Sequence, residues 1–172
     1  MLDWEQVLKD DGPPVWRTAC RLLGNAHDAQ DCFQDALAEV IERSAREPIQ
    51  NPRALLLRVV TSRSLDRLRR RYRRKSTSLS EEVDVPDSTS QPHQHLESIE
   101  ILDSVRDALA ELPENQAQAF VLHCVEDWSY QQIAEHLSIT AGAVGMLLLR
   151  ARTRLKELLS AADGTPMWSQ PR

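Results

Sequence analysis

The stretch NPRALLLRVVTSRSLDRLRRRYRRK, residues 51–75, has the pattern of a single long helix. Asn51 can accept hydrogen bonds from the first free amides of this helix, and Pro52 suits its first position, where no backbone donor is needed. Apolar residues recur at helical spacing and then give way to seven residues, six of them cationic. The apolar set is Leu55, Leu56, Val59, Val60, Leu65 and Leu68. The pattern predicts a helix that is buried at its start and strongly basic at its end.

Charge is distributed unevenly along the chain. The net charge is −5, yet residues 53–75 hold ten of the 21 lysines and arginines and a single acid, Asp66. Concentrated cations can follow the phosphates of a nucleic acid. A basic helix end can also be merely solvated and favoured by the helix dipole, and this interpretation stays open for the run alone. Asp66 is spaced to pair with Arg63, Arg69 or Arg70.

The residues before this helix also favour helices. Hydrophobic residues make up 41% of the chain, aromatic residues 5%, and there are five glycines, a composition that suits helices better than strands. We expect an opening helix that is interrupted at residues 12–14, Gly-Pro-Pro, and resumes from Val15 to Leu23. Asn25 can cap the next helix, whose apolar stripe is Ala29, Cys32, Phe33, Ala36, Leu37, Val40 and Ile41. With no alternating strand pattern of useful length, the predicted fold class is all-α.

The chain is predicted to form two small helical domains. Residues 76–95 are rich in Ser, Pro, Asp and Gln and have no sustained apolar period, which is typical of a flexible linker. They separate residues 1–75 from residues 96–160. The tail, residues 161–172, contains Trp168 and Pro171 in a polar setting and is either disordered or a docking peptide.

The second domain has the pattern of a helix-turn-helix. Its first helix breaks at Leu112-Pro113, a second covers about residues 114–125, and Ser129 with Gln132 predicts a capping box. A short helix, a turn at residues 138–140 and a long helix to about Leu159 follow. Small Ala134 allows the two helices to cross closely. The residues expected to face the core are Ile133, Leu137, Ile139, Val144 and Leu148. An ordinary helical hairpin is the alternative for this segment by itself.

Several functional classes lack their signatures. The chain has no Gly-rich phosphate loop, GxSxG or HExxH, and His93 and His95 fall in the expected linker. Cys20, Cys32 and Cys124 form no CxxC pair and are interpreted as small buried hydrophobic residues. We predict no enzyme activity, metal or cofactor, no secretory signal or membrane span, and a cytoplasmic protein. Three aspartates on one face of residues 28–35 indicate an acidic docking face for a protein.

The order of these parts resembles the extracytoplasmic-function sigma factors, the smallest members of the primary sigma family. Residues 28–35, Asp-Ala-Gln-Asp-Cys-Phe-Gln-Asp, are similar to the family's Asp-Ala-Glu-Asp-Leu-x-Gln-Glu. Residues 66–70, Asp-Arg-Leu-Arg-Arg, match its Asp-x-x-Arg-Arg. Leu112-Pro113, residues 132–135 (Gln-Ile-Ala-Glu) and residues 150–152 (Arg-Ala-Arg) match in the same order. The resemblance covers about residues 5–160.

The resemblance implies partners and contact residues. It implies a docking face for the clamp coiled coil of the polymerase largest subunit, formed by Asp28, Asp31, Phe33, Gln34 and Asp35. It implies contact with the minus-ten promoter DNA by Ser62, Arg63, Asp66, Arg67, Arg69, Arg70 and Arg71. For the upstream element it implies Thr140, Ala141, Ala143, Arg150 and Arg152. The implied partners are core RNA polymerase, promoter DNA and an anti-sigma factor.

The sequence departs from the family in its recognition helix. Where the family has Lys, Ser and Arg, this chain has Gly145, Met146 and Leu147, so polar groups for base or phosphate contact are missing. Ser62 and Leu55 stand where the family has Asn and Trp. Two hypotheses follow: Thr140, Arg150 and Arg152 carry the DNA contact, or the face of this helix meets a protein. A stand-alone helix-turn-helix regulator and a degenerate sigma factor acting as an interaction module are the alternative functions.

Overall fold

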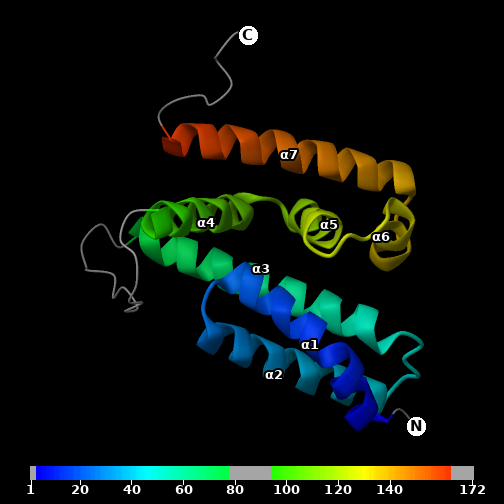
Figure 1. Ribbon diagram of the computed structural model, residues 1–172. Coiled ribbons are helices and arrows are strands. Elements are labelled where there is room, and N and C mark those ends of the chain that lie inside the picture. The colour runs from blue at the N-terminus through cyan, green and yellow to red at the C-terminus, as the bar shows by residue number, and fades with distance from the viewer. Residues whose placement is uncertain (1–2, 78–93, 164–172) are drawn as a thin grey trace.

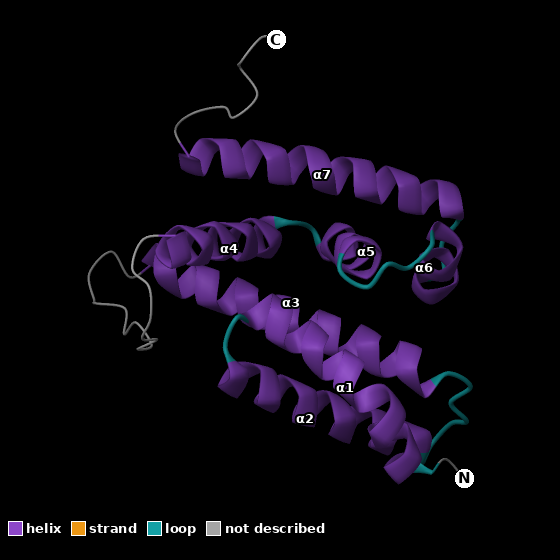
Figure 2. Cartoon of the chain, in the orientation of Figure 1, coloured by secondary structure: helices purple, strands orange, loops and turns teal. Residues whose placement is uncertain are grey.

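A computed structural model describes residues 3–77 and 94–163, and all regular secondary structure in these two ranges is helical. The all-α prediction is confirmed (Figure 2). Figure 1 shows two layers: α1–α3 lie together, and α7 runs along α4, α5 and α6 on the far side. The predicted tail beyond residue 163 and most of the predicted linker lie outside the described residues.

The first layer consists of α1 (Trp4–Leu23), α2 (Ala26–Ser44) and α3 (Pro52–Thr77). The predicted caps form, because the side-chain oxygen of Asn25 accepts from the amide of Asp28 at 2.7 Å and that of Asn51 accepts from the amide of Ala54 at 3.0 Å. Each helix turns an apolar stripe inward. The buried members include Val15, Ala19, Leu22, Ala29, Cys32, Ala36, Val40, Leu56, Val60, Leu65 and Leu68.

The predicted interruption at residues 12–14 is wrong, because α1 continues through Pro13 and Pro14. A proline inside a helix lacks an amide donor and normally bends or breaks it. Here the surrounding packing overrides that tendency: Gly12, Val15, Thr18 and Ala19 are all buried against the rest of the layer. The hydroxyl of Thr18 donates to Oε1 of Glu126 in the second layer at 2.5 Å, and its oxygen lies 3.2 Å from the carbonyl of Pro14.

The second layer consists of α4 (Gln94–Glu111), α5 (Glu114–Cys124), α6 (Tyr130–Leu137) and α7 (Ala141–Asp163). The helix break at Leu112-Pro113 and the capping box of Ser129 and Gln132 are confirmed. Ser138 ends α6 in the left-handed conformation, with φ of 56°, and directs the chain into α7. The short helix, turn and long helix predicted for this segment are therefore present.

The two layers share a continuous hydrophobic cluster. Helix α3 packs against α4 and α5, so Leu68 of the first layer and Ala108, Leu109 and Leu112 of the second belong to the same buried set. Helix occupies both edges of the stretch expected as a linker, since α3 ends at Thr77 and α4 begins at Gln94. In this structure the units are joined by packing as well as by sequence.

The three cysteines differ in burial. Cys32 is buried, its Sγ lies 3.4 Å from Oγ of Ser64, and burial raises the pKa of its thiol. Cys20 is half-buried, and Cys124 is exposed. The expectation of a buried residue is wrong for Cys124, because it is the last residue of the short helix α5 and lies where the chain turns away from the core.

Among the described residues, no single helix is long and apolar enough to cross a membrane; the bent pair Tyr130–Leu137 and Ala141–Ala161 could do so by length and composition alone.

Two glycines should respond to alanine in opposite directions. A Cβ on Gly145, inside α7, would lie 3.6 Å from the ring of Tyr130, an ordinary contact, so Gly145→Ala should raise the free energy of unfolding by about 0.5–1 kcal/mol. Gly24 has φ of 76°, and its Cβ would lie 2.5 Å from Cζ of Arg106. Gly24→Ala should lower the free energy of unfolding by about 1 kcal/mol or more. Urea denaturation measures both, and equal stability of the two variants would contradict the assignment.

Candidate nucleic-acid interface

From Arg63 onward, the cations of α3 divide into three groups by what they contact. In the first group, Arg67 donates from Nη1 to Oδ1 and to the carbonyl oxygen of Asp28 at 3.0 and 3.1 Å, and its Nη2 lies 3.6 Å from Asp31. Arg63 donates to Glu39 at 2.6 Å and lies 3.8 Å from Asp35. Two arginines predicted to bind DNA are thus paired with the acidic face of α2.

That acidic face is still accessible. The side chains of Asp28, Asp31 and Asp35 remain 43%, 44% and 59% exposed in spite of their pairing. Gln34 is exposed as well. Phe33 differs, because it is half-buried and meets the ring of Trp16 edge-on at 6.1 Å between centroids. The polar members of the predicted polymerase face are therefore available to a partner, while Phe33 mainly packs against α1.

The second group faces the other layer. Arg71 and Lys75 lie 3.8 and 3.0 Å from the carboxylates of Asp103 and Asp107 on α4. The hydroxyl of Tyr72 donates to Glu111 at 2.6 Å, and this bond to a carboxylate, with some burial, raises the pKa of the phenol. Arg69 also faces the other layer, because it donates to the carbonyl of Leu112 at 3.3 Å. It pairs with Asp66 of its own helix at 3.1 Å. The hydroxyl of Ser62 lies 3.5 Å from the carboxylate of Glu114.

The third group is open. Arg70, Arg73 and Arg74 are exposed, and no ion pair joins them to another residue within the ranges that the structure describes. They alternate around the end of α3 with the residues that contact α4. Arg53 and Arg58, near the start of α3, are exposed as well, so Arg70, Arg73 and Arg74 are the open cations of its basic end.

The helix-turn-helix is built as its sequence pattern predicts. Ile133, Ala134, Val144 and Leu148 are buried, which fixes α7 across α6, whereas Leu137 and Ile139, also predicted to face the core, are only half-buried. The hydroxyl oxygen of Thr140 accepts from the amide of Ala143 at 3.1 Å and so caps the first turn of α7. Of the other residues predicted to face the upstream element, Ala141 and Ala143 are half-buried, whereas Arg150 and Arg152 are exposed.

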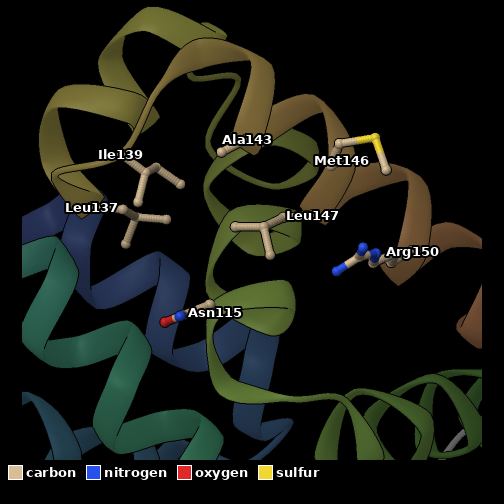
Figure 3. Close-up of a pocket in the computed structure, with 7 residues that line it drawn as sticks. All are labelled: Asn115, Leu137, Ile139, Ala143, Met146, Leu147 and Arg150. Carbon is tan, nitrogen blue, oxygen red and sulfur yellow. The ribbon is translucent and has the colours of Figure 1, made fainter.

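An apolar groove of about 330 Å³ lies beside the first half of α7 (Figure 3). Leu137 and Ile139 form one side, Met146 and Arg150 lie on the other, and Leu147 lies between them. The groove is completed by Ala143 and by Asn115 of α5. Met146 and nearby Leu149 are 49% and 59% exposed, so the helix predicted to face the upstream element presents hydrophobic side chains to solvent.

The two candidate DNA surfaces are far apart. The basic end of α3 lies near α4 at one end of the molecule in Figure 1, and the start of α7 lies beside α6 at the other. They belong to separate layers, so one short DNA contact does not span both.

No group of three or more His, Cys, Asp or Glu side chains in residues 3–77 and 94–163 could hold a metal ion.

The residues most clearly missed by sequence reasoning are on α4. Arg106 donates from Nε to the carbonyl of Leu22 at 3.0 Å and from Nη2 to that of Arg21 at 3.3 Å, and so satisfies the end of α1. A usable signal exists for the acids: Asp103, Asp107 and Glu111 recur every four residues and share one face of the helix. The sequence gives no sign of which surface that face would contact.

The families that match this chain cover both layers. The family "Sigma-70 region 2" matches residues 8–74, which include most of α1–α3, and "Sigma-70, region 4" matches residues 102–155, from α4 into α7. The solved complex of the sigma factor RpoE with the anti-sigma factor NepR from Bartonella quintana is similar in fold. Its TM-score is 0.56 at 24% identity, over 92% of this chain and 97% of that one.

Curated relatives extend over nearly the whole chain. The RNA polymerase sigma-E factor of Streptomyces coelicolor is 31% identical over 167 residues, 95% of this chain and 89% of the relative. The ECF RNA polymerase sigma factor SigM of Mycobacterium tuberculosis is 32% identical over 158 residues, 91% and 76% of the two chains. The ECF RNA polymerase sigma factor SigE of Mycolicibacterium smegmatis is 30% identical over 161 residues. These residues make up 93% of this chain and 63% of the relative.

Two sigma regions in the expected order define the class of protein: a sigma factor, which directs promoter recognition, rather than a stand-alone helix-turn-helix regulator. Sigma factors are non-enzymatic initiation factors. With relatives of this identity and coverage, the chain belongs to the extracytoplasmic-function family of RNA polymerase sigma factors, as its sequence motifs predicted.

A half-buried histidine in α6, His136, makes stability depend on pH. Burial, and then the Arg58 cation, lower the pKa of His136 to about 4. Its ring meets Trp128 edge-on at 5.0 Å, and its Nε2 has no hydrogen-bond partner among the described residues. The unfolded chain therefore binds a proton more readily, and the stability that this neutral ring contributes is lost as the pH falls from about 6.5 towards 4.

The matching variant is His136→Gln, which cannot take up this proton. Urea denaturation at several values from about pH 7 to about pH 5 should show the native chain losing stability relative to the variant. The carboxylates titrate in both proteins and cancel in the comparison. A stability difference that stays constant over this range would show that His136 is not held neutral.

Proposed function

We propose that this chain binds core RNA polymerase through the acidic face of α2 and places the basic end of α3 on the minus-ten promoter DNA. The single observation that carries the proposal is the cluster of Arg70, Arg73 and Arg74: exposed, without ion pairs to described residues, and together at the basic end of the last helix of the part that matches region 2. Phosphates are the ligands that such a cluster attracts most strongly. With polymerase and promoter DNA as its partners, the chain would act in the cytoplasm.

The proposed division of work follows exposure. Asp28, Asp31, Gln34 and Asp35 form the polymerase-docking face, since they are accessible and carry acceptors for basic or polar partner groups. The α3 cations would hold the DNA backbone while the polymerase opens the strands. Tyr72 is the aromatic residue within this run and the candidate for stacking on an unpaired base. The chain itself makes or breaks no covalent bond.

Neutralising the open arginines should abolish most of the activity. The variant Arg70→Gln, Arg73→Gln, Arg74→Gln should lower run-off transcription with purified core polymerase by at least about tenfold, because up to three phosphate contacts are removed. Binding of the variant to core polymerase, followed by gel filtration or fluorescence anisotropy, should stay unchanged, since α2 is untouched.

The matched control removes three exposed arginines elsewhere: Arg43→Gln, Arg46→Gln, Arg53→Gln. It has the same net charge as the first variant and should retain at least about half of the transcription, because general attraction to DNA changes equally in both. Equal losses of transcription in the two variants would show that the effect depends on net charge alone, and would contradict the proposed site.

For the upstream element we propose contact by Thr140, Arg150 and Arg152, with Thr140 also capping α7. Replacing Arg150 and Arg152 by alanine should weaken promoter binding by the polymerase complex. It should also make the plot of log K against log salt concentration shallower by about one unit for each lost phosphate contact. Arg154→Ala is the control, because Arg154 already pairs with Glu157 at 3.2 Å.

An unchanged salt slope in the arginine variant would favour the second candidate, a protein-binding role for this face. The apolar groove with exposed Met146 and Leu149 is the observation that supports it. An anti-sigma factor is a further proposed partner, and the basis is the related RpoE, which was solved in complex with the anti-sigma factor NepR.

A further inference from the structure

The acidic face of α4, defined as Asp103, Asp107 and Glu111, contacts the end of α3 through three separate polar interactions. Arg71 lies 3.8 Å from Asp103, Lys75 lies 3.0 Å from Asp107, and Tyr72 donates to Glu111 at 2.6 Å. Carboxylate oxygens and phosphate oxygens are both anionic acceptors, and they use the same donors on Arg, Lys and Tyr. The acidic face therefore occupies side chains that a nucleic acid would otherwise contact.

Contacts outside the acidic face hold α4 in position. Leu68 of α3 is 3% exposed, and Ala108 and Leu112 of the second layer are 4% and 2% exposed, so an apolar contact lies beneath the charged one. Arg106, with its side chain 14% exposed, reaches the last carbonyls of α1 and also pairs with Asp103 at 3.1 Å. The position of α4 is thus fixed against both α1 and α3.

We infer that the acidic face of α4 is an internal substitute for DNA: it covers Arg71, Tyr72 and Lys75 in the free chain and has to leave α3 before promoter DNA can use them. This inference rests on the proposed role of α3 in DNA binding. Arg70, Arg73 and Arg74 stay open in the covered state, so DNA can make a first, weak contact and then compete for the remaining donors.

The ionic part of this cover is replaceable, and opening it also requires breaking the apolar contact of Leu68 with the second layer. The paired groups are 33–40% exposed at Arg71, Asp103, Lys75 and Asp107, and exposed ion pairs of this kind contribute little each. A DNA backbone offers a continuous row of phosphates and gains from counterion release. Because only open chains offer all the donors of α3, the apparent affinity for DNA falls in proportion to the fraction of chains that are open. A partner that binds the open state tightly can still shift the chain to that state.

The first test detects closure directly. A carbodiimide joins a lysine amine to a carboxylate only at contact distance, and the chain has lysine at only three positions, Lys9, Lys75 and Lys156. Mass spectrometry of the treated full chain should find a Lys75–Asp107 cross-link. A saturating single-stranded oligonucleotide of about 20 nucleotides should reduce its yield at least about fivefold. Absence of the cross-link, or a yield unaffected by the oligonucleotide, would overturn the inference.

The second test measures how much the acidic face of α4 lowers the affinity of the chain for a single-stranded oligonucleotide. The variant Asp103→Asn, Asp107→Asn, Glu111→Gln keeps the side-chain shapes and removes their charge, and it should bind the labelled oligonucleotide about tenfold more tightly than the native chain without polymerase. The control, Glu42→Gln, Glu47→Gln, Glu157→Gln, removes the same charge from acids that pair with arginines of their own helix or its end. Equal gains in the two variants would contradict a specific cover.

The outcomes separate this inference from the proposed function. Loss of run-off transcription in the Arg70, Arg73 and Arg74 variant tests whether α3 serves promoter binding, and it does not depend on α4. The cross-link and the paired affinity measurements test whether α4 covers α3, and they need no polymerase. A cross-link that persists with DNA bound, alongside normal transcription, would refute the cover and leave the proposed function intact.

Discussion

Helix α3 has to meet two opposing requirements along one axis. Leu56, Val60 and Leu65 must be buried to hold α1 and α2 together, and the cations beyond them must stay hydrated or paired, because a buried and unpaired charge is very unfavourable. The change from apolar to basic along the helix settles the conflict. The first half of α3 builds the N-terminal core, and its end projects to where the other layer, or a partner, can supply anions.

Ion pairing is consequently spread over the whole molecule. The acids of α2 pair with Arg63 and Arg67, and those of α4 pair with Arg71 and Lys75, so one helix connects the two acidic surfaces. Pairs with this exposure add little stability. Apolar contacts such as those of Leu68 and Leu112 carry the packing between the layers, and the charges decide which surfaces meet and what can displace them.

Local signals were sufficient for most of the fold. The caps at Asn25 and Asn51, the break at Leu112-Pro113 and the capping box at Ser129 are dictated by residues within one turn of each other, so sequence alone located them. The course of α1 through Pro13 was not predictable, because distant packing overrides the local preference. Nor was the contact of α4 with α3, since an acidic stripe has the same pattern whether it meets solvent, a partner or its own chain.

The two-residue connection between α1 and α2 bears on how the protein is made. Gly24 ends one helix and Asn25 caps the next, so adjacent helices of the first layer meet over short sequence separations, and domains with such local contacts fold quickly. Chains emerge from the ribosome at about 5–20 residues per second, and their first domains fold before later ones exist. During translation, therefore, the arginine-rich end of α3 is exposed without its partners on α4 until the ribosome has synthesised α4.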